Sequence, residues 1–322
     1  MKAAVAAAQD PDDPLAGLEI REVPDPEPRA GWTRVRVRAA GLNPHDLWTL
    51  RGVGHPAERI PMVLGCDAAG VTDDGREVVV YAVLGDPEAG GGDVTLDPRR
   101  ALLSETVDGA LAEYLLVPDR NLVDKPDWLD FAEAAALPVA WGTAYRMLFT
   151  RGRVRPGDTV LVQGASGGVA SAAISLASAA GARVWGTART DAKRAFALER
   201  GAAAVFEPGA RLPERVDVVI ETVGEATWGH SLRSLRPGGT IVTAGAHTGT
   251  LPPAELNRVF FQQLSVVGST MCTPGEFAAL LRMLEATGVR PPVERIPFAD
   301  VRDGFARLDR GEVLGKLVAV LD

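Results

Sequence analysis

The stretch VLVQGASGGVASAAISL, residues 160–176, constrains the fold more than any other part of the chain. It starts with a short apolar run, which is typical of a buried strand. Small residues follow, with glycines at Gly164, Gly167 and Gly168, and then an alanine-rich run that suits a buried helix. Strand, glycine turn and helix in this order indicate an α/β protein with a parallel sheet. The unpaired amides and the dipole at the start of such a helix attract an anion.

The surroundings of this turn favour a dinucleotide as the anion. Gly164 permits a tight turn, and Gly167 and Gly168 let the backbone approach a pyrophosphate without an intervening Cβ. Ala170 stands where a third glycine is often found, and this change affects helix packing rather than the anion site. A purely structural turn in another α/β protein is the alternative. The residues expected to bind the phosphates are Gly164, Ser166, Gly167, Gly168 and Val169.

The end of the next strand, in RVWGTARTDAKR, distinguishes the two nicotinamide dinucleotides. NAD sites usually place a carboxylate there for the ribose 2′-hydroxyl. Here Thr187 is followed by Ala188 and Arg189, with Lys193 a helical turn later. Asp191 comes late, and we expect it to cap the next helix. Cations without an acid suit a 2′-phosphate, so the sequence favours NADP(H); a solvent-exposed Arg189 without a ligand is the alternative.

Composition narrows the class of protein. A chain of 322 residues is expected to form about two domains. A net charge of −8 argues against a nucleic-acid binder. The two cysteines, Cys66 and Cys272, allow neither a disulfide framework nor a thiolate zinc cluster. No apolar run is long enough to span a membrane, and the apolar start is too short for a signal peptide, so we expect a cytoplasmic protein with no membrane partner.

The pattern of predicted strands and helices changes along the chain. In the first third, apolar and polar residues alternate or form short β-rich runs. We expect a long surface loop over residues 85–100. From about residue 121, helices and short apolar strands alternate, which predicts a doubly wound parallel sheet. FADVRDGFARL then predicts a helix, with Val301, Phe305 and Leu308 on one face, and GKLVAVL a closing strand. A β-rich domain interrupted by a dinucleotide-binding domain is the expected architecture.

Several motifs in a fixed order resemble the medium-chain dehydrogenase/reductase superfamily, in particular its zinc-free quinone oxidoreductase type. They are GLNPHD, LGCDAAG, DGALAEYLLVP, LPVAWGTAY, RPGDTVLVQGASGGV, LRPGGTIVTAG and GKLVAVL. The resemblance covers nearly the whole chain. It implies a GroES-like catalytic domain over residues 1–120 and 290–322, and a Rossmann domain that binds NADP(H) over residues 121–289.

The resemblance also implies residues near the nicotinamide and the substrate. Relatives place the following positions near the cofactor: Thr143, Ala244, Gly245, Ala246, Gly268, Ser269, Thr270 and Lys316. Trp48, Cys66 and Trp141 would line the substrate cleft. A homodimer is implied as well, with LSVVGST as the strand at the joining edge.

The same resemblance indicates an enzyme without a metal. Zinc members carry a cysteine at the position of Asn43, His-Glu at Cys66 and Asp67, and a further ligand near Val139. Without zinc, an alkoxide made from an isolated ketone has little stabilisation. Hydride transfer to a quinone or an α,β-unsaturated carbonyl compound gives a delocalised anion, for which hydrogen-bond donors suffice. We therefore expect an NADPH-dependent reductase of such acceptors.

The proton donor is open at this stage. Many relatives carry a tyrosine at the position of Trp48, which cannot act as an acid. Asn43 is the catalytic candidate, as a hydrogen-bond donor, with a buried turn asparagine as the alternative. His45 and Asp67 are weaker candidates for a proton relay. The remaining histidines, His55, His230 and His247, have no assigned role, although His247 follows a strand end.

Three other functions stay under consideration. An enoyl reductase that acts on a carrier-bound chain fits the same residues. A non-catalytic NADPH-binding protein fits the lost tyrosine, although hydride transfer needs little side-chain help. A zinc alcohol dehydrogenase conflicts with Asn43 and Val139.

Overall fold

The computed structural model describes residues 1–321 and divides the chain into two compact units. The first unit comprises residues 1–139 and the segment that begins at Pro291, and the second comprises Ala140–Arg290. Residues 121–139 belong to the first unit because β10 (Leu122–Asp124) pairs with β6 (Glu77–Val80) and α2 (Phe131–Ala135) packs against β3 and β5. The first unit therefore extends beyond the boundary at residue 120 expected from the sequence.

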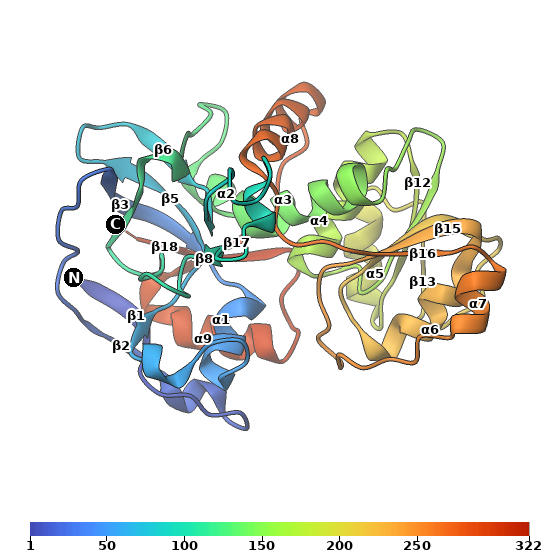
Figure 1. Ribbon diagram of the computed structural model, residues 1–322, viewed down its shortest axis with the longest axis horizontal. Coiled ribbons are helices and arrows are strands. Elements are labelled where there is room, and N and C mark those ends of the chain that lie inside the picture. Colours follow the sequence, from blue (N-terminus) through green and yellow to red (C-terminus); the bar gives the residue numbers. More distant parts are fainter. Residues whose placement is uncertain (322) are drawn as a thin grey trace. The chain divides into compact units, whose positions relative to one another are not determined.

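The first unit is rich in β-strands, and both ends of the chain contribute to it (Figure 1). Its largest sheet has the order β10-β6-β5-β3-β18-β17, with β9 also pairing with β3. Two smaller sheets have the orders β2-β1-β4 and β7-β8. The strands are β1 Lys2–Ala6, β2 Leu18–Glu22, β3 Trp32–Gly41, β4 Met62–Val63, β5 Asp67–Thr72, β6 Glu77–Val80, β7 Val83–Leu84, β8 Ala101–Leu102, β9 Tyr114–Pro118, β10 Leu122–Asp124, β17 Val293–Pro297 and β18 Lys316–Val320.

The register of three of these strands determines which side chains meet. Gly41, at the end of β3, is opposite Asp67 of β5 on one side and Val318 of β18 on the other. The first residue of β18, Lys316, is thereby brought close to the start of β5. Two segments that lie far apart in the sequence become neighbours because both pair with the same strand.

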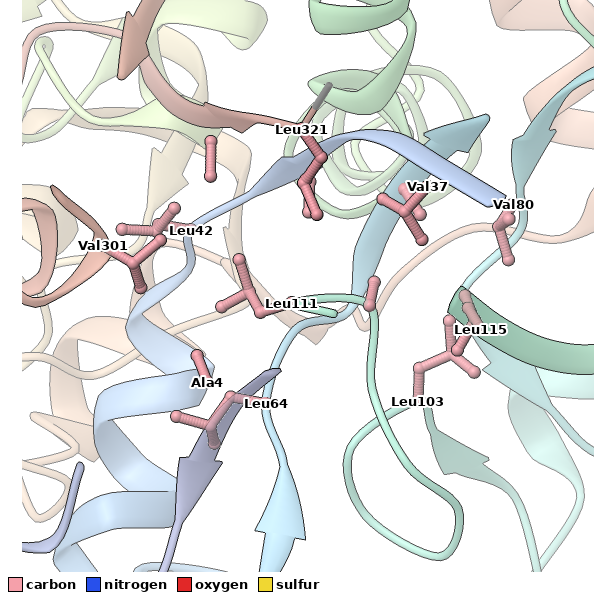
Figure 2. Packing of buried hydrophobic residues seen from close by; sticks show 14 of the residues in the cluster. Ala4, Val37, Leu42, Leu64, Val80, Leu103, Leu111, Leu115, Val301 and Leu321 are labelled. Atoms are coloured by element: carbon pink, nitrogen blue, oxygen red, sulfur yellow. The ribbon is translucent and has the colours of Figure 1, made fainter. Parts of the chain in front are cut away.

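Helices α1 (Pro44–Arg51) and α9 (Val301–Asp309) cover the core of the first unit. The predicted face of α9 is confirmed, since Val301 and Phe305 are buried and Leu308 packs against the core. Figure 2 shows Val301 beside Leu42, close to Leu111. The helix α1 was not expected from the sequence; it begins after Asn43, with Pro44 in its first turn.

The second unit is built on a six-stranded parallel sheet in the order β13-β12-β11-β14-β15-β16, with helices packed around it (Figure 1). All of its strands were expected from the sequence. They are β11 Thr159–Val162, β12 Arg183–Thr187, β13 Ala204–Phe206, β14 Val216–Glu221, β15 Leu235–Thr243 and β16 Ser265–Gly268. The strand order reverses between β11 and β14. Ligands of doubly wound sheets bind at the carboxyl ends of the strands beside such a reversal.

The helices of the second unit include those that connect these strands. They are α3 Gly142–Tyr145, α4 Gly168–Ala179, α5 Asp191–Glu199, α6 Glu225–Ser234, α7 Leu256–Phe261 and α8 Pro274–Thr287. The expected helical region near residue 141 is present as α3 flanked by π-helical turns, Leu137–Trp141 and Arg146–Arg151. Among the described helices, none is long and apolar enough to cross a membrane.

The loop expected over residues 85–100 is present, but it is more ordered than a simple surface loop. It contains a short 3₁₀ turn, Val94–Leu96, capped by the side chain of Asp93. The buried carboxylate of Asp97 accepts hydrogen bonds from the backbone amides of Asp86 and Arg99. These bonds hold the two ends of the loop together.

The packing of α9 can be tested by Phe305→Ala. The ring is fully buried, so its removal should lower the free energy of unfolding by about 3–5 kcal/mol. Val53→Ala, at an exposed position of the same unit, should change it by less than about 0.5 kcal/mol. Urea unfolding of both variants gives the comparison, and equal stabilities would contradict the described core.

Candidate active site

A buried polar cluster in the first unit surrounds Asn43. This residue precedes α1, and its backbone N–H donates to the carboxylate of Asp46 in the first helical turn (2.9 Å). The other oxygen of that carboxylate accepts from the N–H of Gly65 (2.9 Å). Burial raises the pKa of Asp46 to about 6, against the lowering effects of His45 and these amides. Asp46 therefore fixes the start of α1 and leaves the side chain of Asn43 for other partners.

The side chain of Asn43 joins an ion pair between Lys316 and Asp67. Lys316 Nζ lies 2.6 Å from Asp67 Oδ2 and also donates to Asn43 Oδ1. Asn43 Nδ2 donates to the same Asp67 oxygen (2.8 Å) and to the carbonyl of Gly41 (3.2 Å). Asp67 Oδ1 accepts from the N–H of Val139 (2.8 Å). Both oxygens of this carboxylate are thus bound, and its side chain has no exposed surface.

Gly41 makes room for this ion pair. A Cβ at this position would lie 2.8 Å from Cε of Lys316 and 3.0 Å from Cβ of Asp67. Any larger side chain would push the two charged groups apart. The glycine of the GLNPHD motif is therefore required by the lysine of the GKLVAVL motif.

A second cluster surrounds His45, in the first turn of α1. His45 Nε2 donates to Glu105 Oε1 (2.9 Å), and Nδ1 lies 3.4 Å from the sulfur of Cys66. The Cys66 thiol donates to the carbonyl of Leu103 (3.1 Å), so the sulfur receives the Nδ1 hydrogen. Both ring nitrogens of His45 then act as donors, which fits an imidazolium.

The ionisation of this second cluster follows from its contacts. Burial alone would lower the pKa of His45, but Cys66, Glu105 and Asp46 outweigh burial and raise it well above its usual value. Burial raises the pKa of Cys66, so the residue is a thiol at neutral pH. Burial would also raise the pKa of Glu105, but the hydrogen bond from His45 holds it below its usual value. The cluster is an imidazolium–carboxylate pair beside a neutral thiol.

In the second unit, the glycine turn after β11 has the expected form. Gly164 has φ = +66°, and a Cβ there would lie 2.8 Å from Val223. Gly167 precedes α4, and a Cβ at this position would meet no protein atom within 4 Å. Packing therefore does not demand a glycine at position 167, whereas close approach of a ligand does. Ala170 is buried, in agreement with a packing role.

A chain of buried hydrogen bonds supports this turn. Thr187, at the end of β12, accepts from the N–H of Gly164 (3.3 Å) and donates to Gln163 Oε1 (2.6 Å). The amide of Gln163 reaches His230 Nδ1 (2.9 Å) and Ser231 Oγ (3.0 Å). Thr187 thus contacts the turn through its hydroxyl, and His230, which had no assigned role, is a structural partner of the turn.

Glu221 is a further buried group that the sequence did not single out. It ends β14, and its carboxylate accepts from the N–H groups of Val223 and Gly224 and from the hydroxyls of Thr227 and Ser231. These bonds tie the loop after β14 to α6, beside the strand reversal. The sequence feature that could have identified Glu221 is its place as a carboxylate at the end of an apolar strand.

The end of β12 presents two cations. Arg189 is exposed, and Lys193 lies in the first turn of α5. Burial, and after it the nearby positive charge of Arg189, lower the pKa of Lys193. Asp191 does not cap α5, contrary to expectation: Thr190 does so through its side chain, and Asp191 pairs with Arg194 (2.6 Å). The nearest carboxylate is thereby engaged elsewhere.

Other expected cofactor residues also lie at the carboxyl edge of the sheet. Ala244, Gly245 and Ala246 follow β15, and Ser269 follows β16. The hydroxyl of Ser269 is buried and has no partner among the described residues, although its N–H donates to Thr243. It is an available group for a ligand at this edge. Gly268 ends β16, and Thr270 and the exposed His247 lie in the connections after β16 and β15.

The expected substrate-lining residues divide between the units. Trp48, on α1, is half-buried, and Cys66 is fully buried; both belong to the first unit. Trp141 and Thr143 belong to the second, where both are buried and Thr143 Oγ1 lies 3.9 Å from the sulfur of Met271. Lys316, expected near the cofactor, has its ammonium bound to Asp67 and Asn43 instead of standing alone.

Two family models match the chain. The alcohol dehydrogenase GroES-like domain matches residues 29–127, and the zinc-binding dehydrogenase model matches residues 168–286. These matches fall in the first and second units respectively.

Individual proteins agree with this assignment. The chain is 30% identical to a quinone oxidoreductase of Pongo abelii, over 92% of this chain and 91% of the relative. It is 30% identical to an acryloyl-coenzyme A reductase of Metallosphaera sedula, over 94% and 96%. A crystal structure of an NAD-dependent alcohol dehydrogenase superposes with a TM-score of 0.92 at 34% identity and covers 100% of both chains. The chain belongs to the medium-chain dehydrogenase/reductase superfamily and is an oxidoreductase of its quinone oxidoreductase and enoyl reductase-like type.

Proposed function

We propose that this enzyme transfers hydride from NADPH to a quinone or an α,β-unsaturated carbonyl compound without a metal ion. The named activities of the relatives, a quinone oxidoreductase and an acryloyl-coenzyme A reductase, support this class of acceptor. The observation that carries the proposal is the ammonium of Lys316, which lies against Asn43 and Asp67. Zinc members of the superfamily hold their metal at the positions of Asn43, Cys66, Asp67 and Val139.

The residues present do not fit a catalytic zinc ion. Asn43 and Val139 supply no thiolate or imidazole, and Asp67 already binds an ammonium. His45, Asp46 and Cys66 do place possible ligand atoms within 4.8 Å of one another. However, Asp46 accepts two backbone N–H groups, His45 pairs with Glu105, and the Cys66 thiol stays protonated. A metal would have to displace all of these partners.

The lack of a metal site restricts the acceptor. Hydride addition to an isolated ketone makes a localised alkoxide, which a dication stabilises far better than a hydrogen-bond donor does. Addition to a conjugated acceptor makes an enolate or a hydroquinone anion, whose charge is spread over several atoms. A single ammonium and an amide can stabilise such an anion.

The second unit provides the groups that would hold the cofactor. When bound, reduced nicotinamide would supply the hydride, and the protein would bind and orient the cofactor and the acceptor. The turn at Gly164, Ser166, Gly167, Gly168 and Val169 would bind the pyrophosphate through backbone N–H groups. Thr187 would hold that turn in place, and Thr143, Gly245, Ala246 and Ser269 would face the nicotinamide end.

We propose NADPH rather than NADH as the cofactor. Arg189 and Lys193 interact at the end of β12, and the late carboxylate, Asp191, is paired with Arg194. Two cations suit a 2′-phosphate, whereas a ribose 2′-hydroxyl calls for a carboxylate acceptor. The structural neighbour described as NAD-dependent makes this choice worth a direct test.

A second candidate within the same chemistry is an enoyl thioester reductase. The acryloyl-coenzyme A reductase, 30% identical over nearly the whole chain, favours it. An enoyl thioester is an α,β-unsaturated carbonyl compound, so the same residues would serve. The two candidates differ in whether the acceptor is a free molecule or is attached to coenzyme A. Comparing the turnover of free enones with that of coenzyme A thioesters distinguishes them.

We also propose a homodimer joined through the edge strand β16. This strand pairs with β15 on one side only within the described chain. Nearby α7 exposes Leu256, Phe260 and Phe261, the last with 78% of its surface accessible, and β16 exposes Val266. An apolar edge of this kind needs a covering partner.

The metal-free mechanism predicts insensitivity to chelation. Protein treated with a strong chelator should retain its NADPH-dependent turnover of a benzoquinone, phenanthrenequinone or a simple enone. Added zinc should not increase the rate, because Lys316 already provides the positive charge beside Asp67. Loss of activity on chelation, with recovery on zinc addition, would contradict the mechanism.

The cofactor assignment predicts the behaviour of Arg189→Ala/Lys193→Ala. Affinity for NADPH should fall by about 10- to 100-fold, since charge-assisted hydrogen bonds to a phosphate are lost, while affinity for NADH stays the same. Fluorescence titration measures both. Arg155→Ala serves as the control. It removes an exposed arginine that precedes β11, at the amino ends of the strands. An equal loss of both affinities would reject the 2′-phosphate site.

The dimer predicts that Phe261→Asp or Val266→Lys gives monomers in sedimentation experiments. Both substitutions place a charge on the apolar edge, where pairing with a second copy would bury it. Leu198→Asp, at an exposed position of α5, should leave the mass unchanged. Wild-type protein that sediments as a monomer would refute this proposal.

A further inference from the structure

The ammonium of Lys316 has more N–H donors than it has hydrogen-bond acceptors in the protein. An ammonium has three N–H donors. Two of them meet Asp67 Oδ2 and Asn43 Oδ1. The third has no acceptor among the described residues, although the side chain is 4% exposed and belongs to a buried polar cluster. A buried donor without a partner is costly, and its retention at a catalytic cluster indicates a ligand acceptor.

We propose that the third N–H of Lys316 binds the carbonyl oxygen of the acceptor, which makes Lys316 the oxyanion-binding catalytic residue. This inference rests on the proposed function and names the group that replaces the metal. It assigns to Asn43 and Asp67 the role of positioning residues, because they act on the substrate through the ammonium.

The geometry preorganises the ammonium for this task. Asp67 and Asn43 fix Nζ from two directions, and the closeness of Gly41 to Cε leaves the side chain little room to move. Asp67 is itself held by the N–H of Val139. The donor therefore needs no reorganisation when negative charge develops on the oxygen, and burial strengthens its interaction with that charge.

The step balances with the reactants already named. The acceptor gains a hydride, that is one proton and two electrons, and the cofactor is oxidised by the same two electrons. In an enone, a C–H bond forms at the β-carbon, the double bond shifts, and the charge moves to the carbonyl oxygen. Lys316 keeps its own protons and stabilises this oxygen by a hydrogen bond. The second proton, which completes the saturated ketone, comes from solvent.

The experiment compares Lys316→Met with the double variant Lys316→Met/Asp67→Asn. The single variant leaves a buried carboxylate without its cation, so it should unfold more easily. The double variant removes both charges and should recover stability, which thermal unfolding measures. Lys125→Met is the matched control, because the side chain of Lys125, in the first unit, is only 5% exposed and pairs with Glu77 (2.9 Å).

Two readouts follow on these proteins. The first is kcat with NADPH and an enone or quinone, alongside the dissociation constant for NADPH. The second is the absorbance of bound 4-nitrophenol in the NADP⁺ complex, which reports a phenolate oxygen at the same site and requires no turnover.

A catalytic ammonium predicts that the double variant folds, binds NADPH normally and loses about 100-fold or more in kcat. It also predicts that wild type and Lys125→Met favour bound phenolate about tenfold or more over the double variant. A double variant with the wild-type kcat and the wild-type preference for phenolate would overturn the proposal. Wild-type protein that turns over no acceptor, but shows Lys316-dependent phenolate binding, would refute the proposed function and leave the oxyanion site standing.

Discussion

The ion pair between Lys316 and Asp67 links the last strand of the chain to a strand of its first third. It joins the last strand, β18, to β5 across β3, and it determines why residue 41 is a glycine. Removing two charges from water is costly, and well-packed apolar residues often replace a buried pair without loss of stability. Stability alone therefore does not explain why the pair lies here. In the proposed mechanism the pair has a chemical role, because Asp67 occupies a position near the metal of zinc relatives and holds the ammonium of Lys316 there.

In the second unit, the glycine turn after β11 has to be held in place while the space beside it stays free of protein atoms. Gly167 leaves space that no protein atom occupies, so the turn cannot be fixed by packing from the ligand side. Buried hydrogen bonds fix it from below, through Thr187, Gln163 and His230. Such a fully satisfied network is rigid, and rigidity lowers the cost of binding a flexible dinucleotide.

The sequence predicted those parts of the structure that depend on local pattern. The strands of the parallel sheet, the left-handed Gly164 and the buried face of α9 all follow from periodicity and glycine placement. The cap of α5 was assigned to the wrong residue because Thr190 and Asp191 are both good caps, and only the backbone conformation distinguishes them. The cofactor residues remain predictions; those of the glycine turn and of the connections after β12 and β15 lie at the carboxyl edge of the parallel sheet.

Local sequence pattern could not predict the long-range polar pairs of the first unit. Lys316 meets Asp67 only because both strands pair with β3, and Glu105 meets His45 only through the fold of a loop. The sequence singled out Asn43 as a candidate hydrogen-bond donor at a position where zinc relatives carry a cysteine, but it could not show which groups the side chain would contact. Long-range partners of this kind require the register of the sheet, which one sequence does not contain.

In the proposed mechanism an ammonium replaces a dication, and this replacement accounts for the expected range of acceptors. A zinc ion offers two charges and a direct bond to oxygen, whereas Lys316 offers one charge, already shared with Asp67, and one hydrogen bond. The anion formed on such a site has to be stable to a large extent by itself. Quinones and enones meet this condition because conjugation spreads the charge before the protein acts on it. A site with only one ammonium therefore requires a substrate whose anion is delocalised. An isolated ketone does not meet this requirement, because its alkoxide carries a localised charge.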